Sequence, residues 1–204
     1  MPGNELVESL ANSYYRVGQD ETMVITRSNK RANIYNNGIR NMVLDREEEL
    51  SCGDMLMIVK NNYFWTEKER NEVKEALNAI PPFLANGDRA KVLRVSRHME
   101  LYGFRFATLL LQFPDYDNYE MSVTALLDTL QSEAPALTHE QQEQLFHGVE
   151  EDYQDVPLKA DRMKAIRGDQ YFNALQVKYA YAITCHKAQI RRSEERFSRN
   201  AETD

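Results

Sequence analysis

Five consecutive residues near the start of the chain, Thr26 to Lys30, combine side chains that can hold an anion. They follow a short apolar run, 23–26, and precede apolar residues at helical spacing. The backbone N–H groups at the start of a helix attract negative charge, and Arg27 and Lys30 would add positive charge at the same point. The segment therefore predicts a phosphate-binding turn, although a basic residue at such a turn is also typical of an ordinary solvated surface.

A second polar segment, Thr184 to Gln189, follows another apolar run near the end of the chain. Its Thr184, His186 and Lys187 side chains can all donate hydrogen bonds to phosphate oxygens. In an open α/β sheet, ligands gather at the carboxyl ends of the strands, where these three side chains would lie. The alternative is that His186 is a packing residue and Lys187 an exposed surface cation, because a single histidine is weak evidence for a site.

Elements of the α/β kind must hold these two segments side by side. Residues 23–26 and 177–183 are apolar runs typical of strands, and residues 5–15 have the pattern of a helix. Ser28 or Asn29 can cap a second helix. The apolar residues that share one face of this second helix are Ala32, Tyr35, Ile39, Met42 and Val43.

The middle of the chain has the elements of a small antiparallel barrel. Four runs have the composition of strands, with a turn near Tyr102 between the second and the third. Thr66 with Glu69, and Thr138 with Gln141, match the capping box that begins a helix. The second of these helices carries an apolar stripe on an acidic segment. The strand runs are 54–60, 89–99, 104–113 and 119–125, and the stripe is Leu145, Phe146, Val149 and Tyr153.

The net charge of −7 comes from one segment, 131–156, which holds 7 acidic residues and no basic one. The rest of the chain is balanced, so the overall charge does not argue against a local phosphate-binding face. No glycine is followed by lysine, which excludes the phosphate loop of nucleotide hydrolases, and no histidine or cysteine spacing suits a metal.

The start of the chain and its longest apolar runs bear on location. The first ten residues have neither a basic start nor an apolar segment, and no run is long enough to span a membrane. The two cysteines, Cys52 and Cys185, are best interpreted as reduced thiols. We therefore expect a cytoplasmic location and no membrane partner.

Several stretches together resemble motifs of the superfamily one helicases. Residues 26–40, TRSNKRANIYNNGIR, resemble motif IV, and residues 179–189, YAYAITCHKAQ, resemble motif V, usually written T-x-H-K-x-Q-G. Between them, GDMLMIVKNNY (53–63) and LANGD (84–88) resemble conserved strands of the RecD-like branch, the exodeoxyribonuclease V alpha subunit type. The resemblance covers roughly residues 20 to 189, and the motif V match is the most specific part of it.

The resemblance implies a fold and a domain organisation. The fold would be α/β, a partial RecA-like parallel-sheet domain (2A) of the P-loop NTPase type with an inserted small SH3-like β-barrel (2B). Residues 1–50 would form the first part of domain 2A and 51–130 the barrel with a short helix. Residues 131–189 would complete domain 2A, and 190–204 would be a polar tail.

The resemblance also implies a function, the second motor domain of an ATP-dependent DNA helicase. In the family, residues of motifs IV and V bind the backbone of single-stranded DNA, and five positions here take that role. They are Asn29, Lys30, Thr184, His186 and Lys187. An arginine of motif IV reaches the γ-phosphate of ATP, which corresponds to Arg27, and Gln189 stands where the family couples nucleotide state to DNA grip. ATP and Mg would act in the full-length enzyme, with the phosphate loop supplied by an N-terminal motor domain or another chain.

The sequence departs from the family near its end and leaves two alternatives open. Ile190 replaces the glycine expected after Gln189, and motif VI, the phosphate loop and the acidic magnesium motif are missing. We therefore expect no ATPase or helicase activity, no complete catalytic centre and no bound cofactor or metal from this chain alone. The alternatives are a non-catalytic protein-interaction module and an autonomous nucleic-acid-binding barrel.

The autonomous-barrel hypothesis depends on basic and aromatic residues of the middle segment. Five basic residues would form one face of the barrel, and three aromatic residues would offer platforms for unpaired bases. They are Arg89, Lys91, Arg94, Arg97 and Arg105, with Tyr63, Phe64 and Trp65. An aromatic cluster beside a strand is equally typical of a hydrophobic core.

Overall fold

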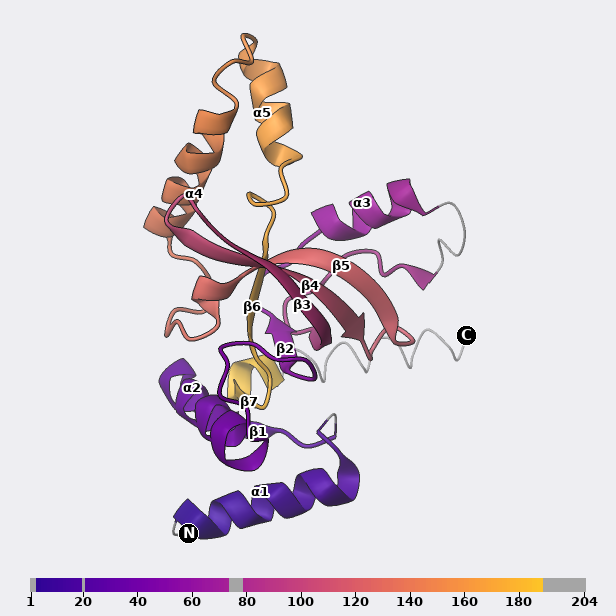
Figure 1. Ribbon diagram of the computed structural model, residues 1–204, viewed down its shortest axis with the longest axis vertical. Helices are drawn as coiled ribbons and strands as arrows, with labels where there is room; N and C mark the ends of the chain where they lie inside the picture. The colour runs from indigo at the N-terminus through magenta and orange to yellow at the C-terminus, as the bar shows by residue number, and fades with distance from the viewer. Residues whose placement is uncertain (1–2, 20, 74–78, 189–204) are drawn as a thin grey trace.

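The computed structural model describes residues 3–19, 21–73 and 79–188 of the chain. A barrel occupies the middle of the molecule, with α4 and α5 at one end and α1 and α2 at the other (Figure 1). The helices are α1 (Gly3–Val17), α2 (Asn29–Gly38), the π-helix η1 (Ile39–Val43), α3 (Phe64–Glu72), the 3-10 helix η3 (Leu127–Thr129), α4 (His139–Asp152) and α5 (Lys159–Arg167). The strands are β1 (Val24–Thr26), β2 (Met55–Ile58), β3 (Arg89–Leu101), β4 (Phe104–Phe113), β5 (Tyr119–Leu126), β6 (Leu175–Tyr179) and β7 (Ala182–Thr184).

Strands β2, β3, β4, β5 and β6 form a closed barrel. Neighbouring strands are antiparallel, except that β5 and β6 run parallel, and β6 pairs with β2 to complete the ring. The main hydrophobic core fills the barrel. The predicted strands of the middle segment are confirmed, as is the turn at Tyr102 and Gly103, where both residues have positive φ (57° and 77°). The predicted α/β class is also confirmed. Within the described ranges, no helix combines the length and the apolar composition needed to cross a membrane.

Strand β6 lies outside the range predicted for the barrel, 51–130. The prediction of one continuous strand over 177–183 is wrong, because β6 pairs within the barrel whereas β7 pairs with β1. The chain changes partners at Ala180 and Tyr181, where the Ala180 N–H donates to Met55 O and Tyr181 O accepts from Val24 N. The whole stretch is buried, so its sequence pattern gives no sign of the change.

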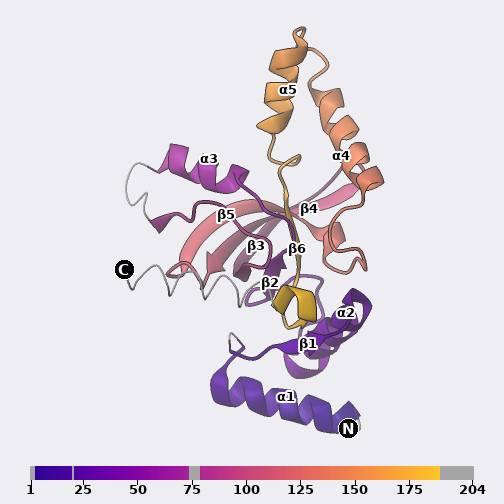
Figure 2. The ribbon, with the colours of Figure 1, turned by 180° about the vertical axis from the view of Figure 1, so that it is seen from behind.

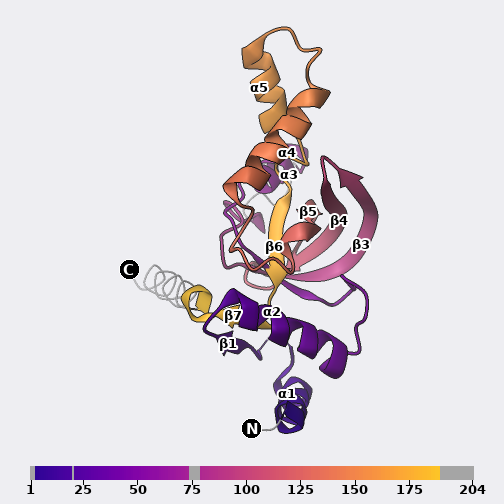
Figure 3. The same cartoon turned by 90° about the vertical axis from the view of Figure 1, so that its left-hand side faces the viewer.

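Strands β1 and β7 form a small parallel sheet, and α2 packs beside it (Figure 3). Ser28 caps α2, since its hydroxyl accepts a hydrogen bond from a backbone N–H of the first turn. The buried Asn36 donates to the carbonyl groups of Tyr179 and Ala182 and accepts from the Ala182 N–H at 2.7 Å. The predicted strand–turn–helix unit is confirmed, except that Met42 is exposed rather than on the buried face.

Helices α4 and α5 form an arm beyond one end of the barrel (Figures 1 and 2). Helix α4 begins with the predicted capping box of Thr138 and Gln141. Its stripe residues Leu145 and Val149 are buried in a second core together with Phe104 of β4. The amphipathic pattern of this acidic segment is therefore confirmed.

Helix α3 begins earlier than the sequence predicts. Tyr63 is the residue before its first turn and makes no side-chain cap, and the Thr66 hydroxyl donates to Tyr63 O. The Glu69 carboxylate accepts a hydrogen bond from the Tyr119 hydroxyl at 3.0 Å. The prediction of a capping box at Thr66 and Glu69 is therefore wrong. The Thr66 hydroxyl bonds to a carbonyl group at the start of the helix, and the Glu69 carboxylate bonds to Tyr119 of β5.

A buried ionic network joins the barrel to the small sheet. Asp54, directly before β2, is fully buried, and its carboxylate accepts two hydrogen bonds from Arg40 of η1, both at 3.0 Å. Arg46 Nη1 and the Tyr181 hydroxyl also donate to it, at 2.9 and 2.8 Å. Burial raises the pKa of Tyr181, so its hydroxyl remains a hydrogen-bond donor. The network holds α2 and η1 in a fixed position against the barrel.

Candidate anion-binding site

The carboxyl ends of β1 and β7 lie side by side. The parallel register places Thr26 opposite Thr184. From there the chain continues from β1 into α2 and from β7 into a helical turn at 185–188. The Thr26 hydroxyl donates to Ile183 O at 3.2 Å, and Cys185 Sγ donates to Thr26 O at 3.2 Å. The prediction that these two distant segments are neighbours is confirmed (Figure 3). Residues 26–30, 178 and 184–187 are called the strand-end site below.

Two lysines of the strand-end site line the same small cavity and are at least partly buried. Lys178 of β6 is 6% exposed, and its ammonium group donates a hydrogen bond to Ser132 O. Lys187 is partly buried, and its ammonium group donates to Asn86 Oδ1. Among the described residues, no carboxylate forms an ion pair with either lysine.

The positive charges of these two lysines repel each other. Burial lowers the pKa of Lys178 to about 8, and repulsion from Lys187 contributes to the decrease. Burial also lowers the pKa of Lys187. A bound anion would relieve both effects, because it would supply the opposite charge that the site lacks. The electrostatics of the strand-end site therefore favour a negatively charged ligand.

A small cavity is lined by both lysines together with Asn29 and Thr184. Its volume is about 20 Å³, which is room for about one water molecule. A phosphate group would therefore lie at the mouth of the cavity. The Asn29 side chain donates to Glu133 O at 3.1 Å, so the segment before α4 forms one wall.

The other predicted site residues lie on the outer surface. Arg27, Lys30 and His186 are exposed, and none of their side chains is hydrogen-bonded or ion-paired to another residue that the structure describes. The structure thus brings Asn29, Thr184 and Lys187 together around the cavity. The exposed side chains of Arg27, Lys30 and His186 are free to turn toward a ligand. Gln189, expected to contact ATP, lies outside the described residues.

Sequence reasoning missed two residues of this region, Lys178 and Asn86. Lys178 is the one charged residue in the run 175–183. Lysine is rarely buried, so a lysine within an apolar strand is a sequence signal of a functional residue. Asn86 lies in a turn that is 101 positions from its partner Lys187, and no local pattern indicates that contact.

Two of the five basic residues expected on one face of the barrel are buried or ion-paired. Arg89 is 7% exposed, and Arg105 is held in ion pairs with Glu49 and Asp128, at 2.9 and 3.2 Å. Trp65 is buried in the main core, as the alternative interpretation has it. Arg94 and Arg97 are exposed, so the autonomous nucleic-acid-binding barrel stays a prediction.

Arg27, expected to contact ATP, directly follows β1. Its guanidinium group is exposed and has no side-chain partner among the described residues. In the described ranges, no group of three His, Cys, Asp or Glu side chains has the arrangement to hold a metal ion.

Comparison with known proteins adds no relative to this picture. No protein-family model matches the chain, and no curated protein matches it at a significant level.

Proposed function

We propose that the strand-end site grips the backbone of single-stranded DNA, and that the chain is the second motor domain of an ATP-dependent DNA helicase of the RecD-like type. The observation that supports this most directly is the pair of Lys178 and Lys187, two cations without a carboxylate partner among the described residues. They lie beside the first turn of α2 and the end of β7. Backbone N–H groups and the Thr184 hydroxyl would add donors at the same place.

In this proposal the residues of the site contact phosphate from two sides. Lys178, Lys187 and Thr184 lie at the cavity and would meet a phosphate at its mouth. Lys30 and His186 would approach the same strand from the surface. Contacts to phosphate fix the position of a strand and carry no sequence information, so we expect binding that is independent of base sequence and sensitive to salt.

The finer features of the fold belong to the same proposal. Strands β1 and β7 with α2 would be part of a RecA-like sheet, and the closed barrel would be the SH3-like domain 2B. ATP with Mg, bound against another motor domain, would supply the free energy that moves the strand. Arg27 would stabilise charge on the phosphoryl group, and the chain alone would hydrolyse no ATP.

Fluorescence anisotropy of a labelled oligothymidylate, measured with the full chain over a range of salt concentrations, tests the proposal. Lys187→Ala and Lys178→Met should each weaken binding and reduce the slope of log K against log salt by about 0.7, the value for one phosphate contact on a single strand. Lys164→Ala, an exposed lysine of α5 at the far end of the molecule, is the matched control and should change neither quantity (Figure 1).

The two alternatives predict different results in the same assay. An interaction module predicts that the double change of His186 and Lys187 to alanine leaves oligonucleotide binding as it is, and this result would contradict the proposal. An autonomous barrel predicts that Arg94→Ala and Arg97→Ala weaken binding more than changes at the strand-end site do.

A further inference from the structure

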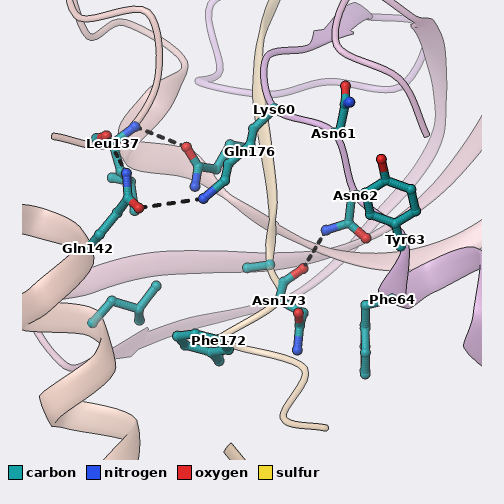
Figure 4. Close-up of a pocket in the computed structure, with 12 residues that line it drawn as sticks. Lys60, Asn61, Asn62, Tyr63, Phe64, Leu137, Gln142, Phe172, Asn173 and Gln176 are labelled. Carbon is teal, nitrogen blue, oxygen red and sulfur yellow. Dashed lines mark hydrogen bonds between the residues drawn. The ribbon is translucent and has the colours of Figure 1, made fainter. Parts of the chain in front are cut away.

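A second, larger cavity lies on the barrel where the segment after β2, the start of α4 and the segment before β6 meet (Figure 4). Its volume is about 230 Å³, enough for a flat aromatic ring system of the size of a nucleobase. Residues of all three segments line it, among them Lys60, Tyr63, Gln142, Phe172 and Gln176. We call it the β2–α4 pocket.

Aromatic rings line the β2–α4 pocket, and the ring of Tyr63 is partly exposed to solvent. Tyr63 is 52% exposed, and its ring stacks on Phe83 with 4.9 Å between ring centroids and 27° between planes. Phe172 contacts Phe146 of α4 edge-on at 6.1 Å. An exposed tyrosine ring held by a second aromatic ring is a rigid platform, since little side-chain freedom is lost when a flat ligand stacks on it.

Polar groups along the pocket offer hydrogen bonds to the edge of such a ligand. Gln176 is 9% exposed, and its Oε1 accepts from the Leu137 N–H at 2.9 Å. Lys60 Nζ is 3.5 Å from Gln142 Oε1, at the limit of a hydrogen bond, and Figure 4 shows it beside the Gln176 amide. Amide and ammonium donors with an amide acceptor match the mixed donors and acceptors of a nucleobase edge.

Hydrogen bonds connect this pocket to the strand-end site. Lys187 Nζ donates to Asn86 Oδ1, and the Asn86 N–H donates to Asn61 Oδ1 at 2.7 Å. Asn61 lines the β2–α4 pocket, and Lys187 lines the cavity of the strand-end site. Asn86 therefore bridges a residue that lines one cavity and a residue that lines the other.

We infer that the β2–α4 pocket receives an unpaired nucleobase of the strand whose phosphate is held by Lys187 and Lys178. The inference rests on the proposed function and adds to it a contact with the base. The base would stack on Tyr63, and its edge would meet the donors of Gln176 and Lys60. Because every base has an aromatic face, the pocket would add affinity without requiring a particular sequence.

The test compares two oligonucleotides of equal length, one of thymidines and one of abasic sites, by anisotropy with the full chain. The chain should bind the thymidine strand about 5- to 150-fold more tightly, the range expected for stacking one base. Tyr63→Ala should remove this preference and leave abasic binding unchanged, and Tyr63→Phe should retain it. Tyr15→Ala, a 92% exposed tyrosine of α1, is the matched control and should keep the preference.

Trp65 provides a second readout, because it is the single tryptophan of the chain and its indole N–H donates to Asn173 O at 2.9 Å, next to the pocket. The thymidine strand should change Trp65 emission, and the abasic strand should change it much less. Equal affinity for the two strands would overturn the inference and leave the proposed function standing. If neither strand binds, the proposed function fails and the inference fails with it.

Discussion

Replacement of Lys178 by methionine should stabilise the folded chain at neutral pH, because it removes a buried charge without a counter-ion. The pKa of this lysine is about 8 in the fold, against 10.5 for a free side chain. Below pH 8 it is charged in both states, and the folded state carries the full cost of burying the charge. Between pH 8 and 10.5 the unfolded chain binds more protons, so stability rises with pH, and above 10.5 the cost is absent.

The size of this effect follows from the difference between the two pKa values, which corresponds to at most about 3 kcal/mol at pH 7. The variant also leaves Ser132 O without its donor, which costs about 1 kcal/mol. The net stabilisation at pH 7 should be about 1–2 kcal/mol. At pH 11 the variant should be slightly less stable than the parent chain, since only the lost hydrogen bond remains.

Urea unfolding followed by circular dichroism, at several pH values from 7 to 11, measures this difference. Lys164→Met on the exposed surface of α5 is the matched control and should change stability little at any pH. A Lys178→Met chain that is less stable than the parent at pH 7, or a difference that does not decrease with pH, would refute the reasoning. Gain of stability together with loss of DNA binding is the behaviour of a residue retained for function.

Two further changes test the network that joins the barrel to the small sheet. Asp54→Asn should destabilise the fold by about 3–5 kcal/mol in urea unfolding, because it leaves the buried Arg40 without its counter-ion; a loss under 1 kcal/mol would contradict this role. Gly53→Ala should cost about 1–3 kcal/mol, since Gly53 has φ +82° and an added Cβ would lie 2.8 Å from Arg46 Nη2. Gly38→Ala is its matched control and should stabilise by about 1 kcal/mol, because Gly38 is helical with open space around it; equal effects of the two alanines would rule out the strain argument.

Elements with strong local signals could be predicted from the sequence. The capping box at Thr138, the cap at Ser28 and the turn at Tyr102 depend on residues within a few positions of each other, and all three are confirmed. The partners of β6 could not be predicted, because the pairing of Met57 with Lys178 joins positions far apart in the chain. A run of buried residues looks the same whichever sheet it enters.

The same distinction holds for the candidate site. The polar ends of two apolar runs predicted that Thr184 and Asn29 would lie near each other, since the ends of adjacent parallel strands meet at one edge. The position of Lys178 could not be predicted, because it depends on closure of the barrel between β2 and β6. The DNA-binding and ATP-contacting roles remain predictions.

The connection between β6 and β7 determines how a bound strand would be held. Only Ala180 and Tyr181 separate the last barrel strand from the small sheet, and the Tyr181 hydroxyl is bonded to the buried Asp54 carboxylate. The barrel and the strand-end site therefore cannot shift relative to each other without breaking the ionic network, which is costly in a buried setting. If a phosphate binds at Lys187 and a base in the β2–α4 pocket, their separation is fixed by the fold before DNA arrives. Pre-organisation of this kind reduces the entropy lost on binding, so removal of the network by Asp54→Asn should weaken affinity for the thymidine strand even where the variant is folded.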